Sequence, residues 1–138
     1  MIVVAVDVGT VRVGVAWGDT EVGLSFPVGV FPRAQGRAER SLLEFLAEKN
    51  ASRVVIGLAL GEQGEETELS ENARRFAARL SKRSGVPTSF VDEAFSSEEA
   101  QERLAIAGVD RSKLDAYAAA IILERFFADD SPQLEQEP

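Results

Sequence analysis

The first 31 residues of the chain form three apolar runs that are separated by short turns. β-Branched residues dominate residues 2–8, apolar and small residues alternate over residues 11–17, and a third run covers residues 22–31. Runs of this length and composition are typical of β-strands, and short connections pair consecutive strands in opposite directions. The pattern therefore predicts a three-stranded antiparallel meander.

The rest of the chain alternates between helical spacing and short apolar strands. Helices are expected at residues 37–49, 69–83, 96–108 and 111–127, and strands at residues 54–58 and 89–92. Strands that are joined through helices run parallel, so these two should extend the meander on one side. The expected fold is α/β: a mixed five-stranded sheet, with the meander and the parallel strands flanked by helices.

The composition restricts the chemistry that the chain can perform. The sequence contains no histidine and no cysteine, which excludes serine–histidine triads, imidazole zinc sites, thiolate chemistry and disulfides. Carboxylates and hydroxyls remain as ligands, and oxygen ligands suit hard cations such as Mg²⁺ or Mn²⁺.

The length and charge complete this picture. We expect one domain over residues 1–130 and a disordered acidic tail over residues 131–138. The net charge is −8, but ten of the fifteen basic residues lie between Arg33 and Arg83, so a local basic face is compatible with the acidic total.

No basic segment precedes the first apolar run and no run is long enough to span a membrane, so we expect a cytoplasmic location.

Asp7 is an acidic residue near the end of a strand that should be buried. Aspartate is depleted in strands, and a buried carboxylate without a partner or a metal ion is costly. The local pattern leaves two interpretations open. Asp7 is either a functional carboxylate or an Asx-turn residue that satisfies the amides of Gly9 and Thr10.

Acidic residues also occur at two other core elements. Asp115 lies in the last expected helix on a stripe that is otherwise apolar, so it should face the sheet; an ion-paired boundary residue is the alternative. Asp92 and Glu93 end the last expected strand. Because neighbouring strand residues point to opposite faces, at most one of these two can join a cluster with Asp7.

Three carboxylates brought together from separate segments repel one another, and divalent cations relieve that repulsion. A pair of metal ions about 4 Å apart can stabilise both the attacking and the leaving oxygen when a phosphodiester is hydrolysed. Such a site needs no histidine. The residues therefore favour a metal-dependent nuclease.

Four segments together resemble the YqgF/RuvX family of bacterial proteins. In chain order they read VAVDVGTVRVGVAWGD, VVIGLALGEQG, DEAFSSEEA and KLDAYAAAIIL. The family comprises ribonuclease-H-like nucleases, described as Holliday junction resolvase homologues and as nucleases for the 5′ end of pre-16S ribosomal RNA. The resemblance covers nearly the whole chain. It implies a ribonuclease-H-like fold and a nuclease that depends on Mg²⁺ or Mn²⁺.

Carried over residue by residue, the resemblance assigns the catalytic and metal-binding roles to Asp7, Glu93 and Asp115. The family's basic residue after the first turn falls on Arg12. Ala94 stands where the family usually has arginine, but this departure removes none of the proposed metal ligands.

Four residues are candidate substrate contacts: Thr10, Arg12, Arg75 and Arg79. Arg12 follows the first turn, where it can reach a phosphate or pair with a neighbouring acid. Arg75 and Arg79 lie on the polar stripe of their expected helix, and a solvated helix face is the alternative explanation of that stripe.

Two other functions compete with the nuclease interpretation. Sugar kinases and actin-like ATPases resemble this fold and open with a similar Asp-x-Gly-Thr turn, although their site lies between two such domains. The acidic net charge instead favours a nucleic-acid-binding module without catalysis. The expected partner is nucleic acid, either a structured DNA junction or a ribosomal RNA precursor, with no membrane. Loops or the surface of a homodimer would read its shape.

Overall fold

A six-stranded mixed sheet in the order β3-β2-β1-β4-β5-β6 forms the centre of the computed structural model, which describes residues 1–94, 96–108, 111–128 and 135–136. The antiparallel part consists of β1 (Ile2–Val8), β2 (Arg12–Asp19) and β3 (Leu24–Pro32). Strands β4 (Arg53–Leu58) and β5 (Thr88–Asp92) continue the sheet parallel to β1, and β6 (Glu135–Gln136) pairs antiparallel to β5.

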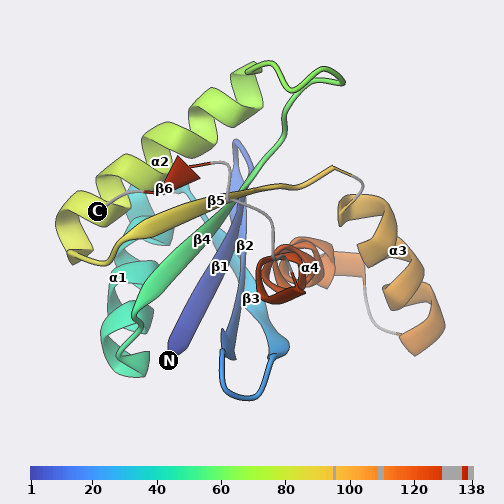
Figure 1. Cartoon of the computed structure of the whole chain (residues 1–138), viewed down its shortest axis with the longest axis horizontal. Helices are drawn as coiled ribbons and strands as arrows, with labels where there is room; N and C mark the ends of the chain where they lie inside the picture. The colour runs from blue at the N-terminus through green and yellow to red at the C-terminus, as the bar shows by residue number, and fades with distance from the viewer. Residues whose placement is uncertain (95, 109–110, 129–134, 137–138) are drawn as a thin grey trace.

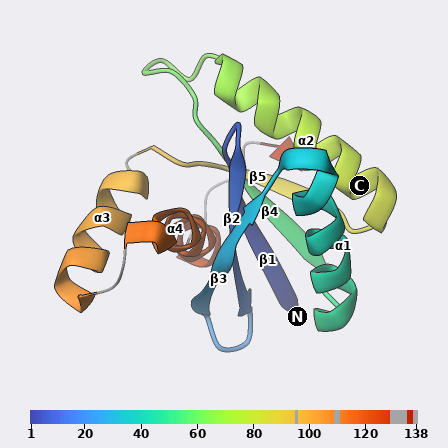
Figure 2. The same cartoon turned by 180° about the vertical axis from the view of Figure 1, so that it is seen from behind.

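Helices cover both faces of this sheet. Helices α1 (Arg37–Lys49) and α2 (Glu68–Ser84) lie on one face, and α4 (Leu114–Ala128) lies on the other (Figure 1). Helix α3 (Ser96–Ala107) packs against α4 on the side away from the sheet, as Figure 2 shows from behind. The side-chain alternation of the strands therefore supplies two separate apolar layers.

The two layers follow from the positions of the apolar residues along β1. Val4 and Val6 point to the α1 and α2 side, whereas Val3 and Ala5 point to α4. Both sets are fully buried, and full burial of a valine-sized side chain contributes roughly 1.5–3 kcal/mol. Because Asp7 has the same parity as Val3 and Ala5, this pattern places it on the α4 face.

The first turn of α2 is fixed by a capping box. The amide of Ser70 donates to Thr67 Oγ1 at 3.1 Å, and the amide of Thr67 donates to Ser70 Oγ at 2.7 Å. The Thr67 hydroxyl in turn donates to the carbonyl oxygen of Ala59, just after β4. The start of α2 is therefore tied to the edge of the sheet where the parallel strands end.

The predicted mixed sheet of five strands is confirmed as β3-β2-β1-β4-β5, and β6 adds a sixth strand beside β5. The last helix begins later than predicted, because a 3₁₀ turn at Arg111–Lys113 precedes α4. Of the predicted acidic tail, Glu135–Gln136 pairs with β5, and the other tail residues lie outside the described residues. Within the described residues, no helix is both long enough and apolar enough to cross a membrane.

Candidate active site

Asp7 lies between two glycines on the neighbouring strands. On β2 it is paired with Gly14, and on β4 the register places Gly57 next to it, one residue after the pair Val6 and Ile56. The carboxylate is thus flanked by positions without side chains. This opening in the α4 face of the sheet leaves room for groups from other elements to reach Asp7.

Gly14 allows the start of α4 to touch the sheet. A Cβ at this position would collide with the carbonyl carbon and oxygen of Asp115 and would lie 2.8 Å from the amide nitrogen of Ala116. These contacts are with backbone atoms, which cannot swing away as a side chain can. Gly14 therefore brings Asp115 next to Asp7 from a segment more than a hundred residues later in the chain.

Glu93 reaches the same opening from the end of β5. Its amide donates to the carbonyl oxygen of Leu58 at 3.1 Å, which continues the pairing with β4 beyond the strand. A Cβ on Gly57 would lie 3.0 Å from Glu93 Oε2, so the glycine leaves space for this carboxylate. Asp92 is exposed, and its Oδ1 accepts from the amide of Ala94 at 2.9 Å. As expected, only one of the two neighbouring acids lies beside Asp7.

The carboxyl groups of Asp7 and Glu93 are hydrogen-bonded to each other, and burial raises the pKa of both. Burial raises the pKa of Asp7 well above its usual value of 3.8, and the negative charge of Glu93, the hydrogen bond to Glu93 and the charge of Asp115 raise it further. Burial also raises the pKa of Glu93, whereas its hydrogen bond with Asp7 lowers it. The protonated form is therefore favoured more strongly at Asp7 and Glu93 than at exposed carboxyl groups.

Asp115 faces Asp7 but is neutralised by an arginine. Arg12 Nε donates to Asp115 Oδ2 at 2.7 Å, and 29% of the Asp115 side chain is exposed. Among the residues that the structure describes, no three acidic side chains are grouped closely enough to hold a metal ion between them. Arg12 thus contacts an acid in this state, which is one of the two alternatives left open from the sequence.

The turn after β1 is held by its backbone rather than by Asp7. The amide of Gly9 donates to the carbonyl oxygen of Arg12 at 2.9 Å. On the other side, Arg33 Nη1 donates to the carbonyl oxygen of Gly9 at 2.7 Å and to Asn72 Oδ1 at 3.1 Å. The amide of Gly9, one of the two donors in the Asx-turn interpretation of Asp7, therefore donates to Arg12 instead. Arg33 connects the turn to α2.

Arg125 is a neighbour of the site that sequence reasoning missed. It lies in the last turn of α4, where its Nη1 donates to the carbonyl oxygen of Asp92 at 3.0 Å and its Nη2 donates to Glu99 Oε1 at 2.9 Å. Its positive charge lowers the pKa of Glu93. Arg125 therefore holds the end of β5 against α4. Its signal in the sequence was a basic residue in a helix that is mostly apolar.

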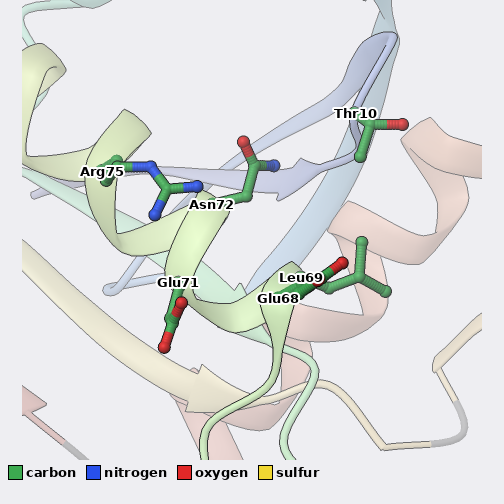
Figure 3. A pocket seen from close by; sticks show the side chains of 6 residues that line it. All are labelled: Thr10, Glu68, Leu69, Glu71, Asn72 and Arg75. Carbon is green, nitrogen blue, oxygen red and sulfur yellow. The ribbon is translucent and has the colours of Figure 1, made fainter.

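The two candidate substrate residues on α2 have different surroundings. Arg79 Nε donates to Glu39 Oε1 at 2.9 Å, and Arg83 holds the other oxygen of the same carboxylate at 3.0 Å. Arg75 instead lines a pocket of about 450 Å³ together with Thr10 (Figure 3). The predicted stripe is thus divided between a surface ion pair that links α2 to α1 and a residue that lines a pocket.

Comparisons with known proteins match almost the whole chain. The sequence model of one family, described as "RuvX: Holliday junction resolvase", matches residues 1–129. A protein of Maridesulfovibrio salexigens named "Putative pre-16S rRNA nuclease" is 41% identical over 133 residues, covering 93% of this chain and 98% of its own. A protein of the same name from Alcanivorax borkumensis is 36% identical over 130 residues, covering 94% and 97%.

Solved structures are similar in fold. The RuvC of Thermus thermophilus in complex with a Holliday junction substrate has a TM-score of 0.56 at 16% identity, over 92% of this chain and 93% of its own. The Fowlpox virus resolvase, also with Holliday junction DNA, has the same TM-score at 12% identity, over 94% and 100%. The predicted ribonuclease-H-like architecture is confirmed by these likenesses.

Proposed function

Since this chain belongs to the RuvX family, we propose that it is a nuclease that hydrolyses nucleic acid phosphodiesters with the help of divalent cations. As substrates we propose pre-16S ribosomal RNA, cleaved at its 5′ end, and Holliday junctions. The names of the relatives mention pre-16S rRNA, and the description of the family mentions the Holliday junction. The observation that supports the proposal most strongly is the pairing of Asp7 with Glu93 in the opening between Gly14 and Gly57. We also propose that the protein acts in the cytoplasm, either as a single chain or as a homodimer.

The donor set fits a hard divalent cation. Asp7, Glu93 and Asp115 offer only carboxylate oxygens, which are the ligands that Mg²⁺ and Mn²⁺ prefer. Burial raises the pKa of Asp7 most, and the nearby charges of Glu93 and Asp115 raise it further; a divalent cation bound by these carboxylates would offset their mutual repulsion. When bound, it supplies stabilisation of the charge that develops on the phosphoryl oxygens.

The residues of the chain have distinct roles in this proposal. Asp7, Glu93 and Asp115 would hold the cation through their carboxylate oxygens, with Asp115 released from its ion pair with Arg12. The guanidinium of Arg12, released in this way, is then free to contact a phosphate of the substrate. Arg75 and Thr10 contact the substrate farther along. Arg79 does so only by giving up its ion pair with Glu39.

The experiment that tests this function is a manganese-dependent cleavage assay on a matched panel. The panel contains a four-way DNA junction, single-stranded DNA, single-stranded RNA and a ribosomal RNA precursor, with Mg²⁺-ATP as a separate arm. We expect cleavage of at least one nucleic acid that stops when EDTA is added, with no hydrolysis of ATP. Turnover of ATP with no nucleic acid cleaved would instead support the phosphotransferase alternative. Binding without any cleavage would support a silent binding module.

A further inference from the structure

A hollow continues from the candidate active site to the first turns of α2. One part, of about 300 Å³, contains Asp115 in its wall, and the other, of about 450 Å³, is the pocket of Figure 3. Thr10 and Leu69 line both parts. The larger part is completed by four residues of α2: Glu68, Glu71, Asn72 and Arg75. A substrate strand that reaches Asp115 can therefore continue past Thr10 into this pocket.

The lining of the hollow includes two apolar side chains that are open to solvent. Leu69 is 49% exposed although it stands in a helix whose other large apolar residues, Phe76 and Leu80, are buried. Val11, on the wall of the smaller part, is 66% exposed. Isolated exposed apolar residues are common, but two at one opening beside polar groups suit the faces of bases and sugars.

The polar wall of the larger pocket contains hydrogen-bond donors at Arg75 and Asn72. Arg75 has no ion-pair partner within the described residues, unlike Arg79 on the next turn of α2. The Asn72 side chain is oriented by Arg33, which donates to its Oδ1, and by its own Nδ2, which donates to the carbonyl oxygen of Gly9 at 3.5 Å and leaves one amide hydrogen as a donor. In Figure 3, Asn72 and Arg75 extend to the same side of α2, whereas Glu71 extends to the opposite side. The arrangement suits an acceptor-rich group such as a phosphate.

We propose that this pocket binds one unpaired nucleotide of the substrate strand, with its phosphate at Arg75 and its base or sugar against Leu69. The inference rests on the proposed nuclease function, and it names a subsite of that function. A volume of about 450 Å³ lies within the usual range for sites that hold one small ligand. It admits a single nucleotide but not a duplex.

The charge around the pocket also disfavours a duplex. Double-stranded DNA carries one negative charge per roughly 1.7 Å of its axis, so a duplex along α2 requires several cations in a row. Here Arg75 is accompanied in the lining by Glu68 and Glu71, and the neighbouring Arg79 is bound to Glu39. One phosphate can be held by Arg75, whereas a row of phosphates meets the two glutamates.

Binding of short oligonucleotides to the full chain without divalent cations tests this subsite. The probes are a labelled single-stranded 12-mer, as RNA and as DNA, and a blunt duplex of the same sequence. The variants Arg75→Gln and Leu69→Ser are compared with Lys82→Gln, which removes an exposed charge from the same helix, and with Ile106→Ser, which removes an exposed apolar side chain. We expect the first two to weaken single-strand binding at least about tenfold and the controls less than about twofold, with duplex binding unchanged.

Equal losses on single strand and duplex would overturn the proposal, and so would unchanged single-strand binding. A nuclear magnetic resonance titration of the unmodified protein with a trinucleotide gives an independent measurement, in which the Leu69 methyl signals should shift before those of Ile106. Failure of the nuclease proposal would look different. Cleavage would be absent while the effects of Arg75→Gln and Leu69→Ser on binding persisted.

Discussion

Replacing Asp7 with asparagine is expected to lower the rate of nucleic acid cleavage at least about a hundredfold, which corresponds to roughly 2.7 kcal/mol of transition-state stabilisation. Asparagine keeps the size of the side chain and much of its hydrogen bonding but removes the charge. A divalent cation would lose a principal ligand between Glu93 and Asp115. A residue that only forms a turn would lose little, because asparagine makes the same turn.

The same variant should remain folded, and its free energy of unfolding should depend less on pH. Because folding raises the pKa of Asp7, the folded metal-free protein disfavours the ionised carboxylate and loses stability as the pH rises above about 3.8 through the raised pKa. Asp7→Asn removes this titration. Its stability relative to the natural protein should therefore be greater at about pH 8 than at about pH 4.

Cleavage time courses and thermal melts, both measured on the purified variant, check this prediction. Asp92→Asn is the matched control, since Asp92 is exposed, precedes Glu93 and has its carboxylate bonded to the amide of Ala94. We expect the control to retain activity within a few-fold. Full activity in Asp7→Asn would rule out a metal-ligand role for this carboxylate. Loss of activity with unfolding would contradict the predicted stability.

Replacing Gly14 with alanine should destabilise the protein by about 3 kcal/mol, the upper part of the range for overpacked cores. The new methyl group would press against the backbone of Asp115 and Ala116, and the start of α4 would have to move away from β2. Since that movement also takes Asp115 away from Asp7, cleavage should fall together with stability.

Gly29→Ala provides the control for this substitution. Gly29 lies in β3, where the nearest atom to an added Cβ is Phe31 Cε1 at 3.6 Å, an ordinary contact distance. We expect its free energy of unfolding, measured by urea denaturation, to change by less than about 1 kcal/mol, because a strand interior accepts alanine at least as well as glycine. A Gly14→Ala protein as stable as the natural one would show that α4 does not need this close approach.

The fold could be predicted to a large extent because strand and helix periods are local properties of the sequence. The run around Asp7 and the helical stripe that contains Asp115 each specify an element and a buried face. Alternation predicted that only one of Asp92 and Glu93 could lie beside Asp7, and the family resemblance indicated Glu93. The start of α4 was less predictable, because a 3₁₀ turn and an α-helical turn have nearly the same spacing.

The details of the site depend on contacts between distant segments, which no local pattern reveals. The ion pair between Arg12 and Asp115 joins residues 103 positions apart, and the ion pair between Arg79 and Glu39 joins residues 40 positions apart. The need for glycine at positions 14 and 57 appears only when α4 and Glu93 are in place. Sequence reasoning proposed Asp7, Glu93 and Asp115 as the site carboxylates, but it could not show which arginine pairs with which acid.

The most direct test of the central claim is a crystal of the protein soaked in Mn²⁺ and measured at the manganese absorption edge. We predict an anomalous peak between Asp7, Glu93 and Asp115, with manganese–oxygen distances of about 2.0–2.2 Å, near the range for small hard cations. Arg12 should have left Asp115 in the same crystal. A well-diffracting soaked crystal with no peak at these carboxylates, and with the Arg12 to Asp115 ion pair intact, would contradict the account.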